Sequence, residues 1–193
     1  GKHYSWHHWQ IIRQNPNNLI HLARTPFLLQ IIISIYINQD GQLLNTRAQL
    51  IAKFIDILLV QENLAYLNDD NRVVKNDAGR LFVTKLSEFA FSNQLRINQW
   101  IVNSDETKNS LPISVLEQSA KLGILHVGRS VKFSNQLFQE YFAALYLING
   151  IHEGHLLPDM LWSEQEWWRL NTWSQVMIFA TSLLDNDAVE LIE

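Results

Sequence analysis

Apolar residues recur at helical spacing along most of the chain, and short polar stretches interrupt them. The segment that begins at Pro26 is apolar on nearly every side, a pattern typical of a helix inside a core. A long amphipathic helix is expected after it, because Thr46-Arg47-Ala48-Gln49 has the form of a capping box. Asn15-Pro16 predicts one more helix start, since proline suits the first helical position. The first part of the sequence is therefore predicted to be a helical bundle.

A polar stretch over residues 68–76 separates this bundle from the rest of the chain. Its amides and charges cannot be buried together, so we expect a linker or a surface loop there. Helical spacing returns beyond it, in the apolar positions between Leu81 and Ala90. A domain boundary is accordingly predicted at residue 68.

The apolar pattern changes from helical to extended around the dipeptide Gly128-Arg129. Residues 124–127 and 130–133 flank this dipeptide, and such a pair of short runs predicts a β-hairpin. Residues 97–102 form a further stretch that could be extended.

Helices are expected on both sides of this hairpin. One should open at Pro112 and end at Gly123, and the next should begin after a cap formed by Ser134 or Asn135. Two helices, a hairpin and another helix succeed one another in a winged helix, a variant of the helix-turn-helix.

The predicted fold class is mainly α: a helical bundle, then a winged-helix domain with a small β-hairpin, then a C-terminal helical segment. The corresponding domains are residues 1–67, 68–150 and 151–193. In the last segment a helix is expected from about Thr172 to Leu184, with the start of another at Ala188. Several large aromatic side chains precede that helix and are expected to fill a domain junction: Trp162, Trp167, Trp168 and Trp173.

Composition narrows the possible functions. Apolar residues make up 47% of the chain, enough for a packed core, and the absence of cysteine excludes disulfides and thiolate chemistry. The longest apolar run, residues 27–37, is shorter than the roughly 20 residues that a bilayer crossing needs. Residues 1–9 do not have the pattern of a secretory signal. We therefore predict a cytoplasmic protein with no membrane partner.

One segment approximates the phosphate-binding loop G-x-x-x-x-G-K-S/T, namely residues 123–130. A phosphate-binding loop comes after a buried strand and opens a helix, whereas this segment is expected to come after a helix and form a hairpin. No other glycine cluster is present. The chain is therefore not expected to hydrolyse ATP by itself.

No metal site or catalytic group is predicted. The histidines that invite a metal hypothesis lack the H-E-x-x-H spacing of a zinc protease and a third ligand. Glu164 and Glu166 have no flanking motif that would mark a catalytic pair, and no nucleophile has a base partner. The five histidines are interpreted as surface or packing residues: His3, His7, His8, His152 and His155.

Two segments in the first half of the chain, residues 22–29 and 41–50, resemble the helical segment directly after the ATPase core in NACHT proteins of the STAND class. Residues 133–144 are similar to the winged-helix signature of that family. The signature has a phenylalanine two places before a histidine, then a Gln-Glu-Tyr-Phe-Ala-Ala run. Trp167-Trp168 and Trp173, ahead of an apolar helix, resemble the segment C-terminal to the signature in bacterial members.

The resemblance implies the regulatory part of a signal-transduction switch in innate immunity, with the ATPase core outside this sequence. ATP or ADP with Mg²⁺ would bind in the parent protein, whose core is the implied partner, and the activated protein would be a homo-oligomer. Pro26 matches the proline that lies against the adenine. Asn135 matches the histidine that approaches the β-phosphate of ADP, but asparagine lacks the imidazolium charge and cannot titrate.

Both residues can also be interpreted without a nucleotide. Pro26 suits a helix start and Asn135 a helix cap without any nucleotide, and Gln139, Glu140 and Tyr141 are expected to be structural. One alternative function is a DNA-binding winged helix, and another is a structural adaptor that joins sensor and effector domains. DNA binding is disfavoured, because the net charge is −4 and residues 77–150 carry only one more basic than acidic side chain.

Overall fold

The computed structural model describes residues 26–38, 46–70, 72–95, 102–103, 111–155 and 173–184. These residues form helices with small antiparallel hairpins, so the chain is mainly α, as the sequence predicts. It divides into two compact units, Gly1–Ile57 and Leu58–Glu193. The three-domain division stays a prediction, and the helices expected at Asn15-Pro16 and Ala188 lie outside the described residues. In these ranges no helix combines the length and apolar character that a membrane crossing requires.

Helix α3 (Pro26–Asn38) belongs to the first unit and begins at the expected proline. Leu28, Ile31 and Ile35 are buried on one face. The opposite face is exposed, since Leu29, Ile33 and Ile37 keep 39%, 49% and 65% of their surface accessible. The expectation of a helix inside a core is therefore corrected. One apolar stripe of α3 is buried, and its other stripe faces outward.

Helix α4 (Arg47–Gln61) has the predicted cap, because Thr46 Oγ1 accepts a hydrogen bond of 3.1 Å from the Gln49 N–H. Its C-terminal end turns at Asn63, whose backbone is left-handed with φ 57°. The Leu64 N–H donates to Leu59 O at 2.8 Å across this turn. That bond satisfies a carbonyl of the last helical turn and ends the helix.

A hairpin comes after α4 where a linker or surface loop is expected. Strands β1 (Ala65–Leu67) and β2 (Val73–Lys75) pair antiparallel, with Tyr66 opposite Val74. The turn between them is exposed at Asp69 and Asp70, as expected for a polar stretch. The linker prediction is thus corrected for β2. Strands this short carry too few residues to show an alternating pattern in the sequence.

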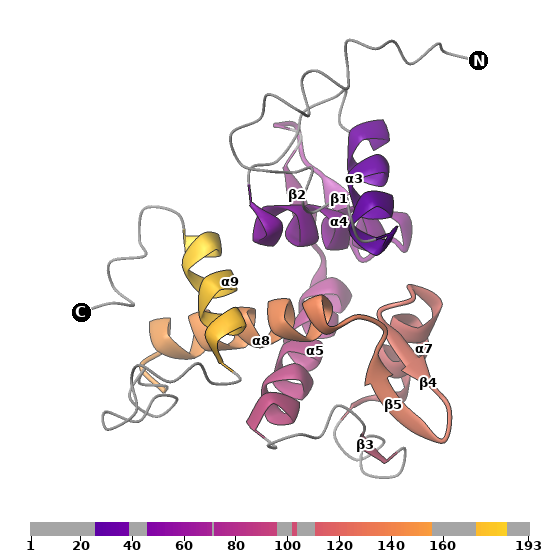
Figure 1. Cartoon of the computed structure of the whole chain (residues 1–193). Helices are drawn as coiled ribbons and strands as arrows, with labels where there is room; N and C mark the ends of the chain where they lie inside the picture. Colours follow the sequence, from indigo (N-terminus) through magenta and orange to yellow (C-terminus); the bar gives the residue numbers. More distant parts are fainter. Residues whose placement is uncertain are drawn as a thin grey trace. The chain divides into compact units, whose positions relative to one another are not determined.

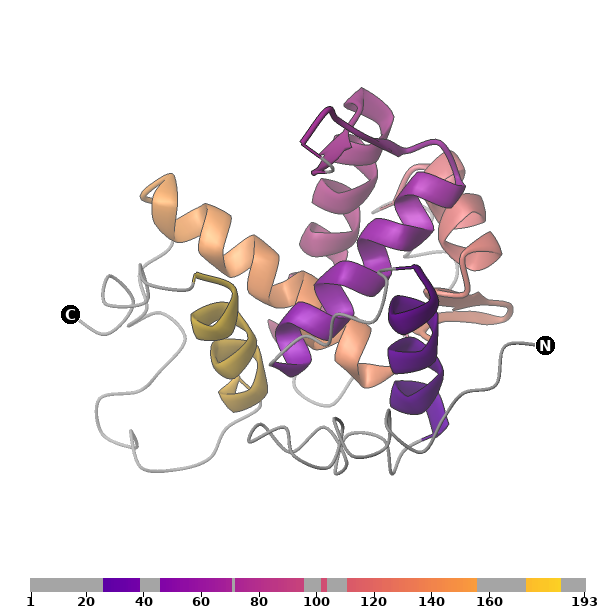
Figure 2. The same ribbon diagram turned by 90° about the horizontal axis from the view of Figure 1, so that it is seen from above.

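The core of the second unit forms where α5 (Asp77–Leu95), α8 (Gln136–His152) and α9 (Ser174–Leu184) pack together. Figure 1 shows α8 crossing α5, and in both Figures 1 and 2 α9 lies next to α8. Helix α8 continues past Gly150, the predicted end of the winged-helix domain, and stops before Gly154 at φ 72°. The largest fully buried side chains of the three helices are Phe82, Leu86, Phe138, Phe142 and Phe179.

Trp173 precedes α9 and is buried against α5. Its ring lies 5.1 Å from that of Phe91, which is also 4.6 Å from Tyr146 on α8. Trp173 thus packs within the second unit, and its place at a domain junction stays a prediction. The other three tryptophans of the segment lie outside the described residues.

A three-stranded sheet completes the second unit. Strand β5 (Ser130–Phe133) lies between β3 (Val102–Asn103) and β4 (Leu125–Val127), and both pairings are antiparallel. Helix α7 (Ile113–Lys121) contacts β4, begins after Pro112 and turns at Gly123 with φ 68°. Helices α5 and α7, the β4–β5 hairpin and α8 succeed one another in the order predicted for a winged helix, and the β4–β5 hairpin is the predicted one.

Candidate functional site

Asn135 lies at the junction between β5 and α8. Its backbone is extended (φ −142°, ψ 142°), and its Oδ1 accepts a hydrogen bond of 2.9 Å from the Leu137 N–H. The side chain is therefore the N-cap of α8, which confirms the simpler of its two interpretations. A role of Asn135 toward a nucleotide stays a prediction.

Ser134 holds the same junction from the strand side. Its N–H donates to Ile124 O at 2.9 Å, and its Oγ donates to Gly123 O at 2.5 Å. The end of β5 is thus bonded to the residues that precede β4. Because of these bonds the hairpin determines where Asn135 lies.

Replacing Asn135 by alanine should lower the free energy of unfolding by about 1 kcal/mol, because an N–H at the start of α8 loses its acceptor. Asn135→Asp should keep the cap and unfold no more easily than the unchanged protein. Urea unfolding followed by circular dichroism measures both variants. An alanine variant as stable as the unchanged protein would show that the cap contributes nothing.

The Gln-Glu-Tyr-Phe-Ala-Ala run, residues 139–144, is buried along its whole length. Gln139 Nε2 donates to Gln94 Oε1 of α5 at 3.0 Å in the interior. Gln136 Nε2 donates to Glu140 Oε1 at 2.7 Å, one turn along α8. Buried polar groups need such partners, since an unpaired one costs free energy. The run holds α8 against its neighbours, as the sequence analysis expects.

Two buried polar atoms of α5, Ser87 Oγ and Asn93 Nδ2, have no hydrogen-bond partner among the described residues. Ser87 is 2% exposed, so its hydroxyl lies away from bulk solvent. Desolvating a hydroxyl without a compensating bond destabilises the folded state. Ser87 is therefore a place where removing a polar group should stabilise the protein.

We expect Ser87→Ala to raise the free energy of unfolding by about 1 kcal/mol, because alanine removes the unsatisfied hydroxyl. Ser92 is exposed on the same helix and serves as the matched control. Ser92→Ala brings the same gain in helix propensity without relief of a buried group. Thermal unfolding compares the two, and equal stabilisation by both substitutions would contradict the argument.

Pro26 is the first residue of α3, is exposed, and lies in the first unit. Its role in starting the helix is confirmed, since its missing N–H would have no partner at that position. Asn135 lies in the second unit. A nucleotide site that uses both residues stays a prediction.

The surface of α7 bears on the DNA-binding alternative, because this helix would enter a DNA groove. Its basic side chain Lys121 is engaged, with Nζ 2.5 Å from Glu62 Oε2. Glu117 is exposed on the same helix, and Gln118 is half-buried. Reading of base edges normally uses several free Arg, Lys, Asn or Gln side chains. The described surface of α7 therefore has few side chains that could read base edges.

Residues 123–130, which approximate a phosphate-binding loop, come after α7 and run into the β4–β5 hairpin. No helix begins at the glycine-rich end of this segment, so its backbone N–H groups cannot surround a phosphate as that loop does. The rejection of a phosphate-binding loop here is confirmed.

His152 and His155 are exposed at the C-terminal end of α8, and His155 Nδ1 lies 3.3 Å from Glu153 Oε2. Within the described ranges no three histidine, aspartate or glutamate side chains gather as a metal site would require. The remaining candidates lie outside those ranges: His3, His7, His8, Glu164 and Glu166.

One close contact that positions α5 is not predicted from the sequence. A Cβ added to Gly79 would lie 2.0 Å from Leu64 O, so the backbone after α4 touches the start of α5. Asn76 caps α5 through a 2.9 Å bond from the Gly79 N–H, and its own N–H donates to Leu64 O at 3.1 Å. A lone glycine near the start of a helical pattern is the signal that could have indicated this contact.

Comparison with known proteins gives no match to this chain, either from a protein-family model or from a curated sequence. The functional conclusion therefore depends on the residues and on their geometry.

Proposed function

We propose that this chain is a regulatory, non-catalytic part of a nucleotide-switched signalling ATPase similar to NACHT proteins of the STAND class. The observation that carries the proposal is the β5–α8 junction. Residues 133–144, which resemble the winged-helix signature, form a strand end, a cap and a buried helix in succession. Asn135, at the position of the signature histidine, thereby stands at the start of α8.

The side chain of Asn135 is compatible with a phosphate ligand. Its Oδ1 is used for capping, whereas its Nδ2 has no hydrogen-bond partner among the described residues. That amino group can donate to a phosphate oxygen without loss of the cap. The first turn of α8 contains no acidic residue that would repel such a ligand.

In this proposal the ATPase core of the parent protein binds ATP or ADP with Mg²⁺. The winged helix contacts bound ADP and stabilises the closed state through that contact. When ATP replaces ADP, the closed state is no longer preferred. The domains then separate and the protein forms a homo-oligomer. The chain contributes contacts that differ between the ADP-bound and the ATP-bound state, and it carries out no chemical step.

The proposal is tested in the polypeptide that carries this sequence, which should contain a phosphate-binding loop N-terminal to it. In that protein Asn135→Asp should weaken ADP binding by about tenfold or more, because a carboxylate then faces the phosphates. The cap itself survives this substitution. Asn135→His, which restores the signature residue, should tighten ADP binding.

Asn76→Asp is the matched control, because Asn76, like Asn135, caps a helix of the second unit. It adds the same charge at the start of α5 and should leave ADP binding unchanged. Calorimetric titration with ADP measures all three variants. The absence of a phosphate-binding loop, or equal ADP affinity for Asn135→Asp and the unchanged protein, would refute the proposal.

One observation favours a DNA-binding function as the second candidate: the β4–β5 hairpin carries Arg129 and Lys132, both exposed. Fluorescence anisotropy with duplex DNA at low salt separates the candidates. Tight binding that weakens steeply with salt would indicate the DNA-binding function. Binding of neither nucleotide nor DNA would leave the structural adaptor.

A further inference from the structure

Helices α4 and α7 end in the same way. Each leads into a left-handed residue, Asn63 at φ 57° and Gly123 at φ 68°. The N–H of that residue donates to the carbonyl three positions before it, at 3.1 Å after α4 and at 3.0 Å after α7. The next N–H donates to the carbonyl five positions before it, at 2.8 and 2.9 Å. Both helices therefore stop in the same tight turn, which satisfies carbonyls of their last turns.

The C-terminal end of α4 carries a charge of the unfavourable sign. A helix end that exposes carbonyls attracts cations and repels anions. The last turn of α4 contains no basic residue, and the acidic residue Glu62 comes directly after it. The Glu62 N–H still donates to Leu58 O at 3.1 Å, so this residue continues the helical hydrogen bonding. Its side chain is only 21% exposed, which limits screening by water, so a nearby cation stabilises this helix end.

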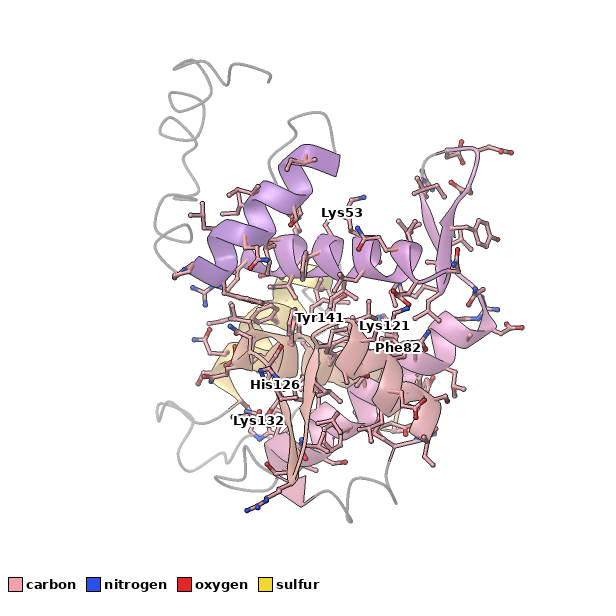
Figure 3. The ribbon with its side chains drawn as sticks, turned by 90° about the vertical axis from the view of Figure 1, so that its right-hand side faces the viewer. Lys53, Phe82, Lys121, His126, Lys132 and Tyr141 are labelled. Atoms are coloured by element: carbon pink, nitrogen blue, oxygen red, sulfur yellow. The ribbon has the colours of Figure 1, made fainter. Side chains whose placement is uncertain are left out.

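Lys121 supplies that cation from α7. Its Nζ lies 2.5 Å from Glu62 Oε2, although the two residues are 59 positions apart. Lys121 also belongs to the last turn of α7, where a positive charge is favourable for α7 itself. Figure 3 shows it apart from His126 and Lys132, two basic side chains of the β4–β5 hairpin. One ammonium group thus stabilises the ends of two helices.

Helix α4 also connects the two compact units along the chain. Its residues up to Ile57 belong to the first unit, whereas residues 58–61 belong to the second, as do Glu62 and Lys121. We propose that Glu62 and Lys121 form an electrostatic latch, which holds the end of α4 on the second unit and opens when the charge of Lys121 is lost or screened. Opening leaves the Glu62 carboxylate unpaired at the negative end of α4, so the last turn unwinds and becomes a hinge. The latch requires no nucleotide and therefore goes beyond the proposed function.

The latch is weak enough to open reversibly, because the Lys121 side chain is 67% exposed. An exposed ion pair changes the ratio of closed to open states by roughly two- to fivefold. Salt at about 1 M limits the reach of exposed charges to roughly 3 Å, so it weakens the attraction of Lys121 to both helix ends. Added salt and neutralisation of Lys121 should therefore act in the same direction.

Hydrogen exchange of the chain alone tests the latch at α4. Lys121→Gln should accelerate exchange of the amides of residues 62–64 by roughly two- to fivefold, because Glu62 loses its cation. Adding Glu62→Gln should reverse most of this acceleration, since no carboxylate then remains at the helix end. Loss of packing by the lysine chain would not be reversed in this way. Lys132→Gln removes the same charge from the β4–β5 hairpin and is the matched control, which should leave exchange at α4 unchanged.

Spin labels test the hinge. The chain contains no cysteine, so Ile37→Cys on α3 and Ser92→Cys on α5 give one exposed labelling position in each unit. Pulsed electron paramagnetic resonance measures the distribution of distances between the two labels. This distribution should be broader with Lys121→Gln than with Lys121 retained. Salt at about 1 M should broaden it when Lys121 is retained and should have little further effect on Lys121→Gln.

A distance distribution that neither Lys121→Gln nor salt broadens would overturn the proposal. So would faster exchange in Lys121→Gln that Glu62→Gln does not reverse, or equal acceleration at α4 by the control Lys132→Gln. No nucleotide is present in these measurements. Their outcome is therefore independent of whether the parent protein binds ADP.

Discussion

Gly79→Ala should lower the free energy of unfolding of the second unit by about 3 kcal/mol or more, a large effect for a single methyl group. The added Cβ would lie 2.0 Å from Leu64 O and 2.9 Å from Leu64 C. Both atoms belong to the backbone, so no side-chain rotation can relieve the overlap. Alanine normally gains about 1 kcal/mol over glycine inside a helix, and the steric cost here exceeds that gain.

The same overlap should disturb the start of α5. Leu64 O accepts the bond from the Asn76 N–H, and Asn76 Oδ1 in turn accepts the bond from the Gly79 N–H. A shift of either backbone segment weakens both bonds. Hydrogen exchange of the α5 amides should therefore accelerate together with the loss of stability measured by urea unfolding.

Two other glycines are controls for Gly79→Ala. Gly128 has no atom within 4 Å of an added Cβ and no left-handed backbone, so Gly128→Ala should change stability by less than about 0.5 kcal/mol. Gly123 is equally open but has φ 68°, so Gly123→Ala should cost about 1 kcal/mol from backbone strain alone. Equal effects of Gly79→Ala and Gly128→Ala would disprove the close contact.

Phe142→Ala should cost about 3–5 kcal/mol, because it leaves a cavity in the middle of the second unit. The Phe142 side chain is 0% exposed, and its ring lies 5.3 Å from that of Tyr141 and 6.2 Å from that of Phe133. Phe133 ends the strand that leads to Asn135. Loss of Phe142 should therefore loosen the β5–α8 junction as well as the helix core.

Denaturant unfolding and hydrogen exchange of α8 measure the effect of Phe142→Ala. The control is Ile113→Ala on α7, which also truncates a large apolar side chain. Ile113 is 66% exposed, so its truncation should change stability by less than about 0.5 kcal/mol. A small effect at Phe142 would contradict the assignment of residues 139–144 to the core.

The caps and turns that start or end individual helices could be predicted from the sequence. Pro26, Thr46 and Asn135 start helices where expected, and the turn at Gly123 ends α7. Each of these signals acts within a few residues, because a cap or a left-handed turn bonds only the adjacent backbone. The winged-helix order of elements results from such signals together with the apolar periodicity.

The candidate site could be predicted only in part. The cap made by Asn135 was one of two interpretations that the sequence allowed, and the structure confirms it. The buried bond between Gln139 and Gln94 could not be foreseen, because these residues are 45 positions apart in the chain. The sequence marks both as polar, and only packing shows that they pair in the interior.

The sequence by itself determined where α3, α4, α7 and α8 begin and where α7 ends, because those choices depend on neighbours along the chain. Tertiary structure alone decided which face of α3 is buried, that β1 and β2 pair, and that Leu64 touches Gly79. It also brings Lys121 Nζ to 2.5 Å from Glu62 Oε2. These outcomes depend on contacts through space, and the periodicity of apolar residues carries no information about such contacts.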